Sequence, residues 1–97
     1  MAIQLRIYTI NRGCLKEWVS EWQEKIRPLR LRLGFEILGA WTIEEKNQFY
    51  WILKYDGKEN WDKLDAAFHG SEERRKMQPN PARHIARAEQ YFLNSVL

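Results

Sequence analysis

The sequence has a single cysteine, no long apolar run and no internal repeat. With only Cys14 available, no disulfide can form within the chain, which fits a protein kept in a reducing compartment. No apolar segment approaches the ~18 residues that a transmembrane helix needs. The first residues enter a strand-like pattern at once, without the basic and apolar regions of a signal peptide. We therefore expect a cytoplasmic protein with no membrane span.

Most motifs that indicate catalysis are also absent. The sequence contains no Gly-rich phosphate loop, no setting for an activated serine or cysteine, and no carboxylate pair. Cys14, His69 and His84 form no recognised metal-binding pattern, so we expect no metal and no cofactor. The net charge of +3 is too small to indicate a nucleic-acid partner by itself.

Aromatic residues, by contrast, are plentiful: five tryptophans in 97 residues imply large buried or contact surfaces. This length is enough for one domain, which we place at residues 1–97. Residues 2–10 alternate between apolar and polar side chains and predict a strand. Two further runs, 35–44 and 49–55, flank a polar tetrad and predict a β-hairpin, in which Gly39 suggests a bulge.

Helical spacing appears twice. Apolar residues recur every three or four positions from Cys14 to Leu33, but Pro28 predicts a kink or break near Arg27, with a second short helix after it. A helix over 58–69, capped by Asp56, and a short helix over 72–77 follow. Residues 85–93 suit either a helix or a strand. We prefer a strand, because a three-stranded sheet would leave the first strand with an unpaired edge.

The resulting order β-α-β-β-α-β predicts an α+β, ferredoxin-like fold with an antiparallel sheet and both helices on one face. The strand 49–55 is nevertheless apolar on both faces. In the strand before it, we expect Ile37 and Trp41 on one face and Leu38 and Ala40 on the other. An apolar sheet face exceeds what monomers leave in water. We therefore predict a homodimer with its sheets face to face; the alternative is a monomer whose second face receives a ligand or partner.

An ordered set of short segments carries a family resemblance. The segments are Arg6-Ile-Tyr-Thr-Ile, Gly34-Phe35, Leu38-Gly39-Ala40-Trp41, Trp51-Ile-Leu-Lys-Tyr-Asp and Asn80-Pro81-Ala82-Arg83. From about residue 4 to residue 93 the chain resembles the NIPSNAP-like domain of the dimeric α+β barrel superfamily. The resemblance implies a ferredoxin-like subunit that dimerises through its sheet, but it supplies no established catalytic residue. Related barrels include cofactor-independent monooxygenases, isomerases and haem enzymes, with sites between sheet and helices.

The candidate ligand-binding residues are Arg6, Tyr8, Trp41, Tyr50 and His84. A charged residue inside a strand is seldom left unpaired, so Arg6 either holds a ligand carboxylate or enolate or pairs across the sheet with Glu89 or Glu36. The aromatic residues either line a pocket or fill the core. His84 is either an acid, base or haem ligand or a residue that satisfies backbone groups at a strand entrance.

Three functions are compatible with these residues. The first is a small-molecule binder or enzyme in the style of cofactor-independent oxygenases, and the second is a non-catalytic dimeric interaction module. The third is RNA binding, because RNA-recognition domains share the predicted topology. It is disfavoured, because the segment 49–55 lacks the basic residue and glycine that precede the stacking aromatics in those domains. The basic, amphipathic run 25–33 is either a solvated helix face, which we favour, or a surface that contacts an anionic membrane or nucleic acid.

Overall fold

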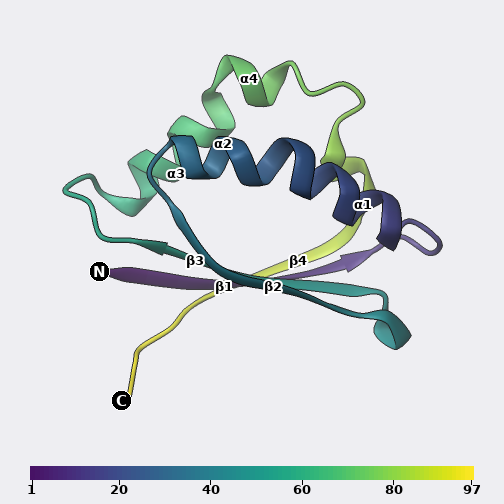
Figure 1. Ribbon diagram of the computed structural model, residues 1–97, viewed down its shortest axis with the longest axis horizontal. Helices are drawn as coiled ribbons and strands as arrows, with labels where there is room; N and C mark the ends of the chain where they lie inside the picture. The colour runs from purple at the N-terminus through teal and green to yellow at the C-terminus, as the bar shows by residue number, and fades with distance from the viewer.

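Four strands form one antiparallel sheet, and the helices pack on a single face of it (Figure 1). The computed structural model describes residues 1–97. The elements in chain order are β1 (Ala2–Ile10), α1 (Leu15–Glu21), a π-helical turn (Trp22–Ile26), α2 (Arg27–Arg32), β2 (Glu36–Ile43), a 3-10 turn (Glu44–Lys46), β3 (Gln48–Tyr55), α3 (Trp61–Gly70), α4 (Glu72–Arg75), a 3-10 turn (Pro81–His84) and β4 (Ile85–Phe92). The sheet order β2-β3-β1-β4 confirms the ferredoxin-like prediction.

The first helical segment is one continuous rod from α1 to α2, although Pro28 interrupts its hydrogen bonding (Figure 1). Pro28 has no N–H to donate, and it occupies the first turn of α2, where such a donor would find no partner inside that helix. The preceding turn widens to π geometry, in which the Arg27 N–H donates to the Trp22 carbonyl. A second short helix begins there as predicted, but the rod is widened rather than broken.

The caps of the later helices follow local side-chain chemistry. The α3 helix begins at Trp61, three residues later than predicted, because Asn60 rather than Asp56 accepts the first free N–H, from Asp62 at 2.7 Å. Ser71 caps α4 as predicted by accepting from the Arg74 N–H at 3.1 Å. No helix is long and apolar enough to cross a membrane.

A bulge in β2 corrects the predicted distribution of its side chains. The register against β3 shifts between Ile37 and Gly39, so the faces of β2 exchange at that point. Ile37 lies opposite Leu53 and Ala40 lies opposite Trp51, both on the helix side. The expectation that Ile37 and Trp41 share a face is therefore wrong, because Trp41 lies on the helix-free side.

The core lies between the sheet and the helices and is rich in aromatic rings. Edge-to-face pairs such as Trp22 and Trp51, with ring centroids 5.4 Å apart, join the helical rod to β3. The buried apolar residues are Tyr8, Ile10, Trp18, Trp22, Ile26, Leu29, Phe35, Phe49, Trp51, Leu53 and Phe68. This cluster fixes one wall of the space described below.

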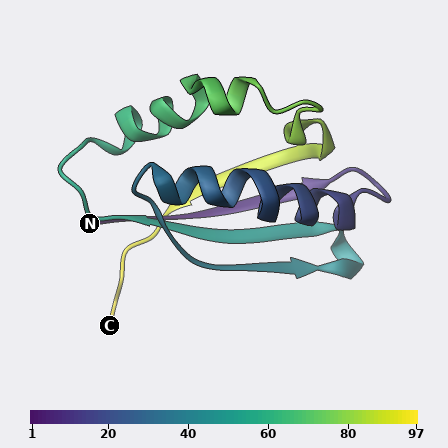
Figure 2. The ribbon, with the colours of Figure 1, turned by 45° about the horizontal axis from the view of Figure 1, so that its top comes forward.

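The opposite face of the sheet carries no helix in either view (Figures 1 and 2). We call it the open face. Its side chains are apolar across three strands: Ile3, Leu5, Ile7, Leu38, Trp41, Tyr50 and Ile52. Leu38 and Trp41 are 51% and 55% exposed in the single chain. The sheet is thus apolar on both faces, as the sequence predicted for β3, and helices cover one of them.

Candidate functional site

Two buried arginines meet one carboxylate beneath the helices. Arg6 lies in the central strand β1, where the alternation of side chains points it toward the helices, and Arg30 lies on α2. They are only 2% and 1% exposed. Both donate to the same oxygen, Oδ1 of Asp65 on α3, at 3.1 Å from Arg6 and 2.7 Å from Arg30. Two positive charges therefore share a single carboxylate.

Arg6 completes its hydrogen bonds with neighbours on its own strand. Its Nε donates to Gln4 Oε1 at 2.7 Å, and its Nη1 donates to the Tyr8 hydroxyl at 3.4 Å. The predicted pairing with Glu89 or Glu36 is wrong, because these carboxylates lie in register with Ile7 and Lys54 on the open face. Arg6 is paired, but with a helix rather than across the sheet.

Arg30 is held by aromatic rings as much as by its ion pair. Its guanidinium carbon lies 3.7 Å from the centroid of the Phe68 ring and 4.9 Å from that of Phe35. Such contacts contribute up to about 2 kcal/mol when they are desolvated. Burial and the charge of Arg6 lower the pKa of Arg30 to about 10, although Asp65 acts in the opposite direction. Its Nε has no hydrogen-bond partner.

Asp65 and His69, one turn apart on α3, are held in different charge states. Burial acts to raise the pKa of Asp65, but the hydrogen bond from Arg30 and the charges of Arg30 and Arg6 outweigh it and lower this pKa. Asp65 is therefore an anion at neutral pH. His69 Nε2 lies 3.6 Å from Asp65 Oδ2. Burial lowers the pKa of His69, and the nearby arginines add to this effect against Asp65, so its imidazole is neutral at pH 7.

A cavity of about 100 Å3 adjoins this cluster. We call it the inner cavity. Its polar wall is formed by Arg6, Tyr8, Arg30, His69 and Arg74, and the remainder by Trp18, Ile26, Trp51, Phe68, Ala82 and Ile85. A shallower space of about 270 Å3, the outer depression, is lined by His69, Arg74, Arg75, Met77, Gln78 and Asn80. The two spaces share His69 and Arg74.

The residues around the inner cavity carry hydrogen-bond donors that have no acceptor. Five buried side-chain nitrogens in the protein lack a partner, and all are donors. Four belong to residues that line the inner cavity: Nε1 of Trp18, Nε1 of Trp51, Nε of Arg30 and Nε of Arg74. Leaving a buried donor unsatisfied costs roughly 1–3 kcal/mol. The four nitrogens themselves have almost no accessible surface, so they lie just behind the cavity wall rather than on it.

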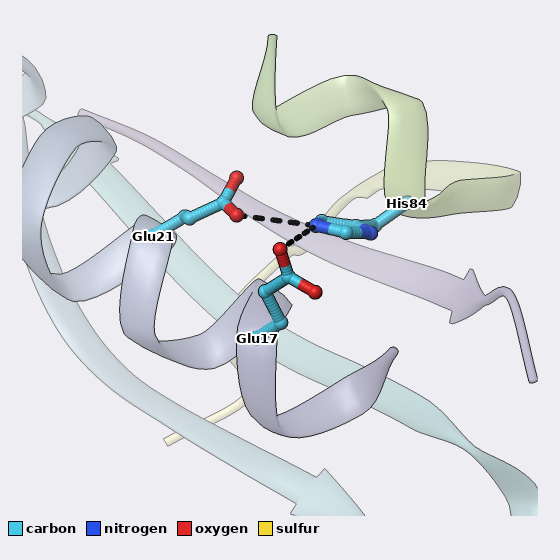
Figure 3. Close-up of side chains that lie close together, drawn as sticks. All are labelled: Glu17, Glu21 and His84. Carbon is cyan, nitrogen blue, oxygen red and sulfur yellow. Dashed lines mark hydrogen bonds and ion pairs between the residues drawn. The ribbon is translucent and has the colours of Figure 1, made fainter. Parts of the chain in front are cut away.

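His84 does not line the inner cavity and belongs to a second cluster, with Glu17 and Glu21 (Figure 3). Its Nε2 lies 3.2 Å from Glu21 Oε2 and 3.7 Å from Glu17 Oε1, and these two glutamates stand one turn apart on α1. Arg83 donates to both carboxylates, with two parallel bonds of 2.8 Å to Glu21. Because this guanidinium already compensates the carboxylates, we interpret the cluster as an ion-pair network that ties α1 to the entrance of β4.

Family comparison agrees with the fold. The NIPSNAP family model matches residues 3–96, which is almost the entire chain. The chain belongs to the NIPSNAP family. The resemblance seen in the sequence is thereby confirmed. No curated protein sequence matches the chain significantly.

Solved structures of other NIPSNAP proteins have the same fold at low sequence identity. An uncharacterized NIPSNAP domain protein from Burkholderia xenovorans superposes with a TM-score of 0.84 at 18% identity, over 98% of this chain and 94% of that one. A NIPSNAP family protein from Agrobacterium tumefaciens gives 0.85 at 15% identity, over 96% and 90%. A putative antibiotic biosynthesis monooxygenase from Bacteriodes thetaiotaomicron gives 0.73 at 16% identity, over 99% and 90%. These likenesses establish the fold alone.

In this NIPSNAP chain the five residues predicted from sequence fall into three places. Arg6 and Tyr8 line the inner cavity. Trp41 and Tyr50 face each other across the β2–β3 ladder on the open face. His84 lies in the ion-pair network. The structure therefore joins two of the five in one site and separates the other three from it.

Sequence reasoning missed four polar residues of the NIPSNAP cavity region: Arg30, Asp65, His69 and Arg74. For two of these residues, Arg30 and Asp65, the sequence did contain a signal. Arg30 lies four residues after the buried Ile26, and Asp65 lies three residues before the buried Phe68, so both fall on the apolar stripe of their helix. Charged residues on such a stripe are buried with a partner or a ligand.

The Glu21 cluster predicts loss of stability in acid. The hydrogen bond from Arg83 lowers the pKa of Glu21 more than burial raises it, and His84 adds to the lowering. A lowered folded-state pKa stabilises the protein above the unfolded value, and this stability is lost as pH falls through the folded value. We expect Glu21→Gln to reduce the free energy of unfolding at pH 7 by about 1 kcal/mol. We also expect the free energy of unfolding of Glu21→Gln to fall less steeply below pH 5 than that of the unmodified protein.

Denaturant titrations between pH 3 and pH 7 measure both effects. Glu24→Gln is the matched control, because Glu24 is exposed on the same helical rod and forms no ion pair. An identical pH profile for Glu21→Gln and the unmodified protein contradicts the prediction.

Proposed function

We propose that this NIPSNAP protein is a homodimer that binds a small organic molecule in the inner cavity. The observation that carries the proposal is the inner cavity itself, whose wall includes two buried arginines that share one carboxylate. A core built only for packing seldom holds two guanidiniums for one carboxylate, because a buried charge without its own partner is unfavourable. The cavity also combines apolar walls with a few convergent polar groups, which is typical of small-molecule sites.

The dimer is supported by the open face. Its apolar residues span three adjacent strands and include Trp41 and Leu38, each about half exposed. Monomeric proteins rarely leave an apolar patch of more than a few hundred Å2 in water. A second copy presents the same apolar surface, so two sheets that meet face to face around a twofold axis cover both patches. A cytoplasmic location, which the single cysteine favours, stays a prediction.

A reaction in the style of cofactor-independent oxygenases is the second candidate. Structural neighbours bear the name antibiotic biosynthesis monooxygenase, and the inner cavity holds groups that such chemistry needs. Arg6 and Arg30 can stabilise an enolate, and the neutral His69 can accept the proton that its formation releases. The rate of deuterium uptake from heavy water by a 1,3-dicarbonyl probe, in excess of the rate without protein, checks this step. We expect it to be lost in His69→Gln and kept in Arg12→Gln, which changes an exposed turn.

Ligand binding is tested by nuclear magnetic resonance of the indole N–H groups. We expect members of a library of small polar fragments to shift the signals of Trp18 and Trp51, which line the inner cavity, more than those of Trp41 and Trp61, which do not. Ala82→Leu, which adds bulk to the cavity wall, should weaken these shifts at least fivefold. Ala66→Leu, an exposed site on α3, is the control.

The binding proposal fails if no fragment at 10 mM moves either cavity indole. It also fails if Ala82→Leu and Ala66→Leu respond identically. The non-catalytic interaction module is then the better account of the NIPSNAP chain.

A further inference from the structure

We propose that the ligand is an organic anion whose carboxylate enters the inner cavity and whose polar tail lies in the outer depression. This inference rests on the proposed function and specifies the chemical class of its ligand. Three features carry it: the charges around the inner cavity, the donors left free, and the sizes of the two spaces.

The charges around the inner cavity do not balance. Arg6, Arg30 and Arg74 supply three positive charges, and all three side chains line the space. Asp65 is the one carboxylate that pairs with them, and it uses a single oxygen for both Arg6 and Arg30. Arg6 and Arg30 are buried, whereas Arg74 is partly exposed, and a buried charge is strongly unfavourable unless it is paired. A ligand with at least one negative charge would reduce this excess, whereas a neutral ligand would not.

Arg30 and Arg74 keep more uncommitted N–H groups than Arg6 does. Arg6 already donates from each of its three nitrogens, to Gln4, Tyr8 and Asp65, so only two of its five N–H groups are uncommitted. Arg30 and Arg74 each keep an unpartnered Nε. Arg74 is also anchored by a bond from its Nη2 to Asn80 Oδ1 at 3.0 Å, which fixes its side chain between the inner cavity and the outer depression.

The sizes of the two spaces limit what can enter. An apolar cavity of about 150 Å3 accommodates benzene. The inner cavity, at about 100 Å3, is smaller, so it takes a carboxylate group with two or three further carbons rather than an aromatic acid. The outer depression offers about 270 Å3 lined by Arg75, Gln78 and Asn80. A linear acid with a polar distal group therefore fits the two spaces together.

Water alone does not account for the arrangement. Liquid water occupies about 30 Å3 per molecule, so the inner cavity could hold roughly three. Waters can solvate the guanidinium groups that border the space, but they leave the excess positive charge in place. A carboxylate satisfies both requirements, because its two oxygens accept several hydrogen bonds and carry the missing charge.

The test compares acids with amides of the same shape. Butyrate and butyramide are titrated at low salt while the Trp18 and Trp51 indole signals are followed. We expect butyrate to bind at least tenfold more tightly. We expect 6-hydroxyhexanoate, whose tail reaches the outer depression, to bind more tightly than butyrate. Arg74→Gln should weaken butyrate at least fivefold and leave butyramide unchanged, whereas Arg12→Gln, an exposed residue outside both spaces, should affect neither.

The outcomes separate this inference from the proposed function. Equal or tighter binding of butyramide at the same indoles overturns the anionic ligand but leaves the binding site. A response to chloride alone, with no response to either organic probe, also overturns the organic anion. If no fragment of the library shifts the indole N–H signal of Trp18 or Trp51, both proposals are overturned. Thermal melting of Arg74→Gln is measured alongside, and Arg74→Lys, which keeps the charge, should recover part of the butyrate affinity if the variant is folded.

Discussion

Asp65→Asn should destabilise the protein by roughly 2–4 kcal/mol, the largest stability loss that we expect from a single isosteric change. Asp65 is the carboxylate between Arg6 and Arg30, which are 2% and 1% exposed. Its removal leaves two buried guanidiniums with no anion. The asparagine keeps the shape of the side chain and one acceptor oxygen, so the loss of stability reports the removal of the negative charge. Because Asp65 itself is 24% exposed, we expect less than the full cost of a deeply buried pair.

Denaturant unfolding at pH 7 and at one fixed protein concentration measures the loss. For a domain of this size it corresponds to a melting point lower by on the order of 10–20 °C. Asp62→Asn is the matched control, because Asp62 is exposed on the same helix and makes no ion pair. Equal effects of Asp65→Asn and Asp62→Asn would show that the buried cluster does not depend on this charge.

A double-mutant cycle with Arg30→Met makes the test sharper. If Asp65 mainly compensates Arg30, the second substitution should recover part of the stability that Asp65→Asn loses, and the two changes should not add. The same reasoning links stability to the proposed ligand. Butyrate should protect Asp65→Asn against unfolding more than it protects the unmodified protein, because the anion replaces the missing charge.

The fold was predictable because its elements are recorded locally in the sequence. The alternation in residues 2–10 and the two runs around the turn at 45–48 specify three strands, and all three lie where predicted. The fourth strand followed from an argument about edges rather than from its own residues, because its alanines and glutamates also suit a helix. The local sequence patterns agreed with the need to pair the free edge of the first strand. The order of the elements then determined the topology.

The bulge at Leu38 shows what local patterns do not record. Gly39 suggested an irregularity, but a glycine alone does not state which residue is extra or on which side the strand resumes. One inserted residue exchanges every later side chain between the two faces. The pairing of Trp41 with Tyr50 on the open face depends on this register. The local sequence pattern does not predict the register.

The site was half predictable for a similar reason. Arg6 was recognised because a charge inside a strand needs a partner, but its partner lies 59 residues away on α3. Sequence spacing cannot identify contacts between elements whose packing is not yet known. The charges of Arg30 and Asp65 on apolar helical stripes were the stronger signal. A charged residue that interrupts an apolar stripe on each of two helices predicts that those helices share a buried polar site.

The two faces of the sheet therefore use their side chains for different purposes. The helix side places three arginines, an aspartate and a histidine around a small space within an aromatic core. The open side is apolar at its centre, with charged residues such as Glu36, Lys54 and Glu89 toward its edges. The first is suited to recognising a small polar molecule, and the second to contacting a large apolar surface. This difference motivates the second major prediction.

Ile52→Lys should convert the proposed homodimer into a monomer. Ile52 lies at the centre of the open face, opposite Leu5 of β1 and Gly39 of β2. In a twofold dimer the substitution buries two unpaired ammonium groups. At about 2 kcal/mol for each, the expected loss is about 4 kcal/mol, or a thousandfold rise in the dimer dissociation constant. In the isolated subunit the new side chain faces water, so the fold and the inner cavity should persist.

Sedimentation velocity over a range of protein concentrations measures the dissociation constant, and circular dichroism verifies the fold. Leu31→Lys is the matched control: it replaces an apolar residue that is 44% exposed on the helical layer, away from the open face, and it should leave the dimer intact. The expected result is a dimer for the unmodified protein and Leu31→Lys, and a folded monomer for Ile52→Lys. An unmodified protein that sediments as a monomer at micromolar concentration contradicts the proposed dimer. An Ile52→Lys dimer of unchanged affinity contradicts its placement on the open face.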